Sequence, residues 1–189
     1  MAIIVGLSGA SGVVYGVKFL EALKSLKVES HLIISQGAKS TLALETGYKL
    51  SYVESLASHN HSIADIAAPP ASGSFKTDGM VVIPASMKTI GGMAHGYAEN
   101  LLLRAAEVTL KERRRLIVVP RETPLSMIDI ENLLTLARAG AIIVPAMPAF
   151  YNRPKTLDDI ENNLVAKVLD LLQIEHNLAD RWTGPGKRK

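Results

Sequence analysis

The sequence predicts a single-domain α/β protein in which a parallel sheet is covered by helices on both faces. Its 189 residues fit one domain, since domains commonly span about 100–200 residues. Short runs rich in Ile and Val alternate with longer stretches in which apolar residues recur at helical spacing. Repetition of strand and helix is typical of parallel sheets, because a crossover is needed to return the chain to the same edge.

Five apolar segments are expected to form the strands. They are short and continuously apolar, which indicates strands buried on both faces. The predicted strands cover residues 2–7, 30–35, 79–84, 115–120 and 141–145.

Five helices are expected between and after these strands. In the last two, Ser126 with Asp129 and Thr156 with Asp159 have capping-box spacing, and Gly140 is suited to the position after a helix end. The predicted helices cover residues 13–26, 36–46, 100–113, 126–139 and 156–172.

Residues 49–76 have no clear periodicity and contain the sequence PPASGS at 69–74. This pattern predicts a long loop or a short insertion. Loops of this length are uncommon in compact domains unless they serve a function.

Composition excludes several classes of protein. With no cysteine in the chain, disulfides, thiolate metal sites and a cysteine nucleophile are excluded. No apolar run reaches the roughly 20 residues of a membrane span, and the start lacks the basic region of a secretory signal. We therefore expect a cytoplasmic protein with no membrane partner. Residues 1–182 are predicted to form the domain, and residues 183–189 a basic flexible tail.

The charge balance leans weakly toward anionic partners, but the motifs of nucleic-acid binding are missing. The chain has 21 basic and 18 acidic residues, a net charge of +3. Basic residues gather at 111–115 and 187–189, but no stacking motif or recognition helix accompanies them.

Candidate site residues follow the predicted strands at their carboxyl ends, where open parallel sheets bind ligands. Small, hydroxylic and charged residues recur there, at 8–12, 35, 85–89, 121–123 and 146–148. The first of these loops is rich in glycine, which lets the backbone approach a phosphate ahead of a helix. It matches neither GxGxxG nor the Walker pattern, so a phosphate loop and a tight turn remain equal alternatives.

Other candidates also have structural alternatives. Ser86, Lys88 and Thr89 offer hydroxyls and a cation to phosphate, or Ser86 is simply a helix cap. Arg121 and Glu122 could bind phosphate and relay a proton, or form a surface ion pair.

Two further charged residues lie within apolar surroundings. Glu45 could be an acid with a raised pKa, although spacing favours a solvated helix face. Lys167 could hold an anion, although a side chain that extends to solvent is favoured.

The histidines do not form a recognisable metal motif. None of the five lies at helical metal-ligand spacing from another ligand, and His59 and His61 lie in the irregular segment. We therefore expect no metal. Spacing alone predicts an α/β protein that binds a phosphorylated ligand, without giving its reaction.

Specific motifs run in order along almost the whole chain. They are GASG at 9–12, LIIS at 32–35, LET at 44–46, PPASGS at 69–74, PASMKT at 84–89, NLLLRAAEVTLKERR at 100–114, PRETPLS at 120–126, PAFY at 148–151 and RW at 181–182. In these motifs the chain resembles the flavin prenyltransferases of the UbiX family, including the small subunits associated with phenolic-acid decarboxylases.

The resemblance implies a flavodoxin-like, Rossmann-like three-layer sandwich assembled into a homododecamer with flavin sites at subunit interfaces. It implies metal-independent transfer of a dimethylallyl group from dimethylallyl phosphate to N5 and C6 of reduced FMN. The product, prenylated FMN, would serve a UbiD-type decarboxylase.

The resemblance also implies roles for individual residues. Tyr151 and Lys167 would bind the prenyl phosphate, Trp182 would face the prenyl group, and Ser11 would lie near N5. A charged set around the phosphate and its proton traffic would comprise Arg104, Lys111, Glu45 and Glu122. The implied FMN contacts are Gly9, Ala10, Ser11, Ser35, Ser86, Met87, Lys88, Thr89 and Arg121.

The chain departs from the family pattern at a few positions. Ala85 stands where many members have cysteine, residues 128–130 read Ile-Asp-Ile in place of the frequent Ile-His-Leu, and Lys167 replaces an arginine of some members. Because lysine lacks the guanidinium fork, weaker discrimination among phosphates is expected there.

Two other functions remain as alternatives. PASMKT is similar to a loop of the FMN-dependent oxidative decarboxylases that act on cysteine, but residues 13–16 lack the histidine of that group. A non-catalytic flavin-binding subunit of a decarboxylase would tolerate loss of Glu45, Glu122 and Tyr151, all of which are present.

Overall fold

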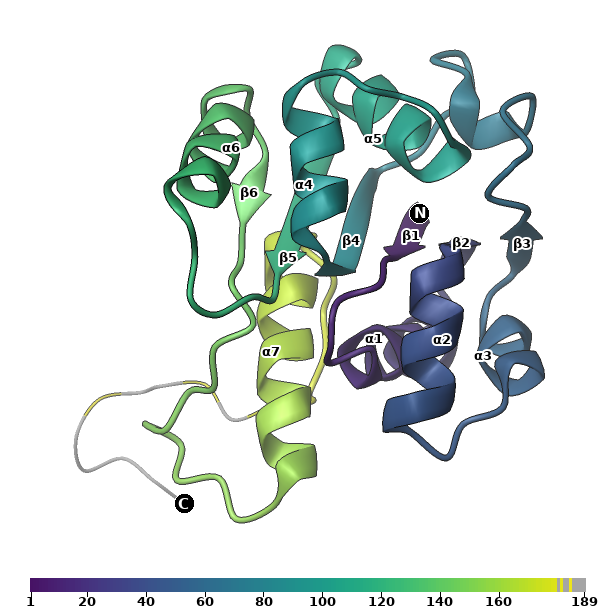
Figure 1. Ribbon diagram of the computed structural model, residues 1–189. Coiled ribbons are helices and arrows are strands. Elements are labelled where there is room, and N and C mark those ends of the chain that lie inside the picture. Colours follow the sequence, from purple (N-terminus) through teal and green to yellow (C-terminus); the bar gives the residue numbers. More distant parts are fainter. Residues whose placement is uncertain (180, 182–183, 185–189) are drawn as a thin grey trace.

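The computed structural model describes residues 1–179, 181 and 184. The expected basic tail therefore lies outside the described residues, apart from Gly184. A single six-stranded sheet crosses the molecule in the order β3-β2-β1-β4-β5-β6, and every pair of neighbouring strands is parallel. Figure 1 shows helices α4, α5 and α6 on one side of this sheet and α1, α3 and α7 on the other. The predicted α/β three-layer fold is confirmed.

The strands are β1 (Ala2–Leu7), β2 (Glu29–Ile34), β3 (His59–His61), β4 (Gly79–Ala85), β5 (Arg115–Pro120) and β6 (Ile142–Ile143). The helices are α1 (Val14–Ser25), α2 (Gln36–Glu45), α3 (Leu50–Leu56), α4 (Met87–Ala94), α5 (Leu101–Lys111), α6 (Met127–Arg138) and α7 (Leu157–Leu171), with a 3-10 turn at Pro69–Ala71.

The core has two parts, one on each face of the sheet. Alternate residues of a strand point to opposite faces, so Ile3 and Val5 of β1 pack against α1 and α7, while Ile4 packs in the layer of α4 and α5. Both faces of the four central strands are covered, as the continuously apolar sequences predicted.

Residues 49–76 do not form the long loop that was one of the two predicted alternatives. This segment contains α3, the edge strand β3 and the 3-10 turn. The sequence of β3 is His-Asn-His, which has no apolar run; its pairing with β2 holds it in the sheet. Helix α4 was also missed, whereas both predicted capping boxes and the positive φ of Gly140 are confirmed.

The sequence predicts that no segment spans a membrane. Within the described part of the chain, no helix is both long and apolar enough to cross a bilayer.

Candidate functional site

The carboxyl ends of β1 and β4 are joined by the side chain of Ser8, which is 1% exposed. Its hydroxyl donates to the carbonyl of Pro84 at 3.0 Å and accepts from the amide of Ser86 at 2.7 Å. Ser8 lies in the candidate segment 8–12, but its bridging role was not predicted, because nothing in the sequence distinguishes a bridging hydroxyl from a solvated one. It fixes the loop after β1 relative to the start of α4.

The loops after β1 and β2 come into backbone contact. A Cβ added at Gly9 would lie 2.9 Å from the Cα of Gly37, which is too close for any side chain. The glycine-rich loop therefore needs glycine at this position to lie beside the start of α2. This contact brings the residues around Ser11 and Ser35 to one part of the edge.

Two helices begin at this edge with hydroxyl caps. Ser35 accepts from the amide of Ala38 at 3.1 Å, and Ser86 accepts from that of Thr89 at 3.4 Å. The hydroxyls of Ser86 and Thr89 also lie 3.1 Å apart. The capping alternative for Ser86 is thus confirmed. The same helix starts direct a positive dipole end toward an anion.

Glu45 braces the glycine-rich loop. Its carboxylate, on the last residue of α2, accepts from the amide of Gly12 at 2.8 Å. Gly12 has φ +91°, a conformation that favours glycine. The carboxylate is exposed and lies immediately before α1.

Arg121 follows β5, and its amide donates to the carbonyl of Ala85 at 3.3 Å, next to Ser86. Its charge is felt by Tyr15 on α1. Burial raises the pKa of Tyr15 and Glu161 raises it further, whereas Arg121 lowers it. Glu122 accepts from the amide of Thr123 at 3.0 Å. No ion pair joins Arg121 to Glu122 within the described residues, so that alternative was wrong.

The remaining cation of this set, Lys88, extends into solvent. Its side chain is 88% exposed, and its ammonium lies 3.8 Å from the carboxylate of Glu99. A pair this exposed and this long fixes the lysine weakly. The ammonium of Lys88 is therefore able to move toward a phosphate.

The two expected phosphate ligands of α5 are not brought to these loops in one chain. Arg104 donates to the carbonyl of Ala71 at 3.2 Å and pairs with Glu107 at 2.9 Å. Lys111 lies at the end of α5, just before β5 begins, and so at the amino edge of the sheet. Its ammonium lies 2.6 Å from Glu112, and this contact lowers the pKa of that carboxyl.

The last group of expected residues lies near the end of the chain. Tyr151 is 51% exposed on the loop after β6. Lys167 is exposed on α7 between the buried Ala166 and Val168. Trp182 lies outside the described residues. The structure therefore brings the expected flavin contacts and Glu45 to one edge of the sheet, whereas Lys111 lies at the opposite edge.

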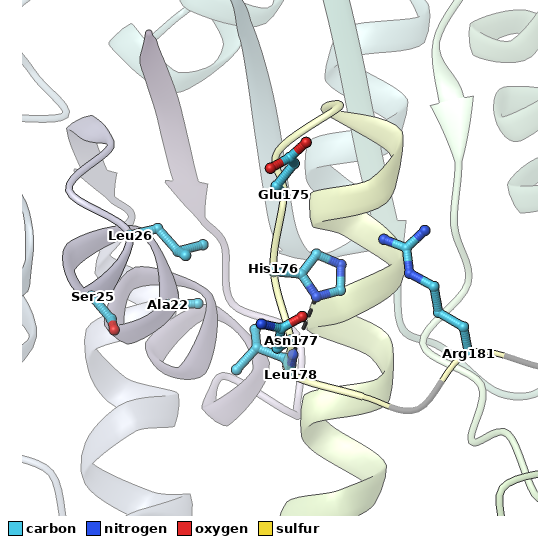
Figure 2. A pocket seen from close by; sticks show the side chains of 8 residues that line it. All are labelled: Ala22, Ser25, Leu26, Glu175, His176, Asn177, Leu178 and Arg181. Carbon is cyan, nitrogen blue, oxygen red and sulfur yellow. Dashed lines mark hydrogen bonds between the residues drawn. The ribbon is translucent and has the colours of Figure 1, made fainter. Parts of the chain in front are cut away.

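A separate pocket of about 800 Å³ lies at the far end of α1, away from the glycine-rich loop. Figure 2 shows it between Ala22–Leu26 and the segment that follows α7. His176 accepts from the amide of Leu178 at 3.3 Å and lies 3.2 Å from Asp170. Both ring nitrogens are thus engaged, and this pocket is not part of the site at the sheet edge.

Comparison with known proteins identifies the family. A family model described as Flavoprotein matches residues 1–174. A probable UbiX-like flavin prenyltransferase of Escherichia coli O157:H7 is 54% identical over 185 residues, which make up 97% of this chain and 94% of that protein. The chain belongs to the family of UbiX-like flavin prenyltransferases.

Solved UbiX structures share both the fold and its extent. A dodecameric FMN-dependent UbiX-like decarboxylase from Escherichia coli O157:H7 is 54% identical, with a TM-score of 0.95 over 97% of this chain and 100% of that one. A UbiX protein, AnUbiX, in complex with FMN and dimethylallyl pyrophosphate is 46% identical, with a TM-score of 0.96 over 97% of each chain.

The edge of this UbiX-like chain fits the phosphate of a flavin mononucleotide. Helix starts and serine hydroxyls supply neutral donors, and Arg121 supplies a charge that suits a phosphate. The close contact of Gly9 with Gly37 leaves backbone, not side chain, beside those donors.

Proposed function

We propose that this protein transfers a dimethylallyl group from dimethylallyl phosphate to N5 and C6 of reduced FMN. The observation that supports it most is the gathering of hydroxyls, helix starts and Arg121 at one sheet edge, in a chain 46% identical to a UbiX protein complexed with FMN and dimethylallyl pyrophosphate. The product, prenylated FMN, would be delivered to a UbiD-type decarboxylase. A cytoplasmic location stays a prediction.

The flavin would be held by the loops after β1, β2, β4 and β5. Reduced FMN, when bound, supplies N5 and C6 as the atoms that receive the prenyl group. The protein then has to position the two substrates, exclude water and move protons. The residues proposed to hold the flavin are Gly9, Ala10, Ser11, Ser35, Ser86, Met87, Lys88, Thr89 and Arg121, with Ser11 nearest N5.

The departing phosphate would be stabilised by residues of neighbouring copies. Cleavage of the allylic C–O bond leaves a phosphate whose negative charge needs donors already in place. Arg104, Lys111, Tyr151 and Lys167 would supply such donors, but within one chain Lys111 lies at the edge of the sheet opposite the glycine-rich loop. We infer that the chains form a homo-oligomer, a dodecamer as in the Escherichia coli relative, with each site completed between chains.

Two carboxylates and an aromatic ring complete the proposed site. Glu45 and Glu122 would carry the protons that the reaction releases and consumes. Trp182 would face the prenyl group. The proposed domain extends to residue 182, followed by the tail of residues 183–189.

The decarboxylase alternative is disfavoured by the start of α1. The histidine expected of cysteine-type oxidative decarboxylases has no counterpart at residues 13–16, where Tyr15 is the only side chain with a titratable group. A non-catalytic flavin-binding subunit is distinguished by the experiment that follows.

The test is anaerobic turnover of the full-length protein with reduced FMN and dimethylallyl phosphate, run with and without a chelator. The flavin is extracted and weighed by mass spectrometry. We expect a flavin heavier by one C5H8 unit in both reactions. Unmodified flavin with both the monophosphate and the pyrophosphate, from protein shown to bind FMN by absorbance, would refute the transferase.

A further inference from the structure

Four side chains with metal-ligand chemistry gather on one face of the edge strand β3 and its neighbour β2. His31 pairs with His59 in the register of these strands. Since alternate residues share a face, Glu29 and His31 of β2 lie on the same side as His59 and His61 of β3. Spacing in the sequence could not reveal this group, because its members come from two segments that only the sheet brings together.

The donor atoms of this group converge. One carboxylate oxygen of Glu29 lies 3.4 Å from Nε2 of His31 and 3.2 Å from Nε2 of His59. These three ligand atoms all lie within 4.8 Å of one another. The rings of His31 and His59 are stacked, with centroids 4.6 Å apart.

His31 is held in place from its other side. Its Nδ1 lies 3.0 Å from Nε2 of His61, and the edge of Phe75 packs against its ring at a centroid distance of 5.0 Å. When Nδ1 donates its proton to His61, Nε2 keeps its lone pair and faces Glu29. An imidazole oriented through its second nitrogen is the usual arrangement of a metal-binding histidine.

The Nε2 atom of His31 is buried without a hydrogen bond in the described part of the chain. The side chain of His31 is only 6% exposed. A buried nitrogen without a partner needs a physical reason. Here it lies opposite a carboxylate oxygen, and a cation between the two would satisfy both.

We propose that Glu29, His31 and His59 bind one divalent transition-metal ion of the zinc class, with His61 as the residue that orients His31. Two imidazoles and one carboxylate are an established ligand set for Zn²⁺, and water completes the coordination. Hard ions such as Mg²⁺ prefer oxygen ligands and would bind poorly. The ion would fasten the three-residue edge strand β3 to β2 and take no part in prenyl transfer.

The test is equilibrium dialysis of the metal-stripped, full-length protein against Zn²⁺, with Co²⁺ as a spectroscopic probe. We expect one ion per chain and visible Co²⁺ absorption bands. Glu29→Gln and His59→Asn should each weaken binding at least about 10-fold. Both side chains are half exposed, so these variants should fold. Zn²⁺ should also raise Tm of the wild type but not of His59→Asn.

The matched control is His95→Gln, because His95 lies at the end of α4 and its ring contacts Asn132. This variant should bind Zn²⁺ as the wild type does. The proposal would be overturned by the absence of stoichiometric Zn²⁺ binding, or by binding that survives both Glu29→Gln and His59→Asn. Either result leaves the prenyltransferase proposal unaffected, because that activity is measured with a chelator present.

Discussion

At the scale of single residues, two roles of Glu45 can be tested separately. Its carboxylate accepts a hydrogen bond from the amide of Gly12, and it is proposed to carry a proton. Glu45→Gln keeps an oxygen that can accept from the amide of Gly12, but removes the proton carrier. Glu45→Ala removes both. We expect Glu45→Gln to bind FMN as the wild type does and to slow prenyl transfer about 10²-fold or more. Glu45→Ala should lose FMN affinity as well, because the glycine-rich loop loses its brace.

These two variants are compared by FMN titration and by the rate at which the heavier flavin forms. Wild-type turnover in Glu45→Gln would remove Glu45 from proton transfer and leave it a positioning role. Equal FMN affinity in Glu45→Ala and the wild type would show that the loop holds its conformation without the carboxylate.

The sequence identified Glu45 as a candidate residue, but its contact with Gly12 could not be predicted. The apolar run around it suggested either a buried acid or a solvated helix face. Its partner Gly12 lies 33 residues away, and only the packing of α2 beside the first loop brings the two together. For the same reason, spacing did not reveal that Ser8 joins β1 to β4.

At the scale of secondary-structure elements, α1 is seated on the sheet through Gly16. A Cβ at this position would lie 2.4 Å from a methyl of Leu7 and 2.5 Å from the carbonyl oxygen of Ile83. Because the backbone of Ile83 cannot shift without a cost in free energy, we expect Gly16→Ala to overpack this contact. Overpacking should destabilise the fold by about 1–3 kcal/mol, even though alanine has the better helix propensity.

The control for Gly16→Ala is Gly47→Ala, since a Cβ at Gly47 would meet nothing within 4 Å. Its free energy of unfolding should stay within about 0.5 kcal/mol of the wild type. Both are measured by denaturant unfolding of the same preparation. A Gly16→Ala protein as stable as Gly47→Ala would mean that α1 shifts on the sheet without cost.

The strands that the sequence predicted are stabilised differently from the strand that it missed. Strands β1, β4 and β5 are apolar, apart from Arg115 at the start of β5, and are buried on both faces. Their sequences alone therefore identify them. Strand β3 is polar and exists through its hydrogen bonds to β2. Because β3 depends on pairing with β2, its sequence needs no apolar run, and residues 49–76 were therefore predicted as a loop or an insertion.

At the scale of the whole molecule, one chain presents unpartnered apolar side chains on its surface. Met127 and Ile128 at the start of α6 are 70% and 68% exposed, and Ile130 is 48% exposed. Several exposed apolar side chains within one short segment are typical of an interface between proteins. It agrees with the inferred homo-oligomer, in which residues apart in one chain meet across subunits.

Assembly of the site from several copies predicts recovery of activity between two inactive variants. Glu45→Gln and Lys111→Met should each be slow alone. If every site takes Glu45 from one chain and Lys111 from another, co-expression restores about a quarter of the sites by random assortment of subunits. Mixed oligomers, purified through two different tags, should therefore prenylate FMN measurably.

Glu45→Gln co-expressed with the double variant Glu45→Gln/Lys111→Met is the control, because no site in it can hold both native residues. Activity no higher than in this control, with each variant slow alone, would place both residues in the same chain's site.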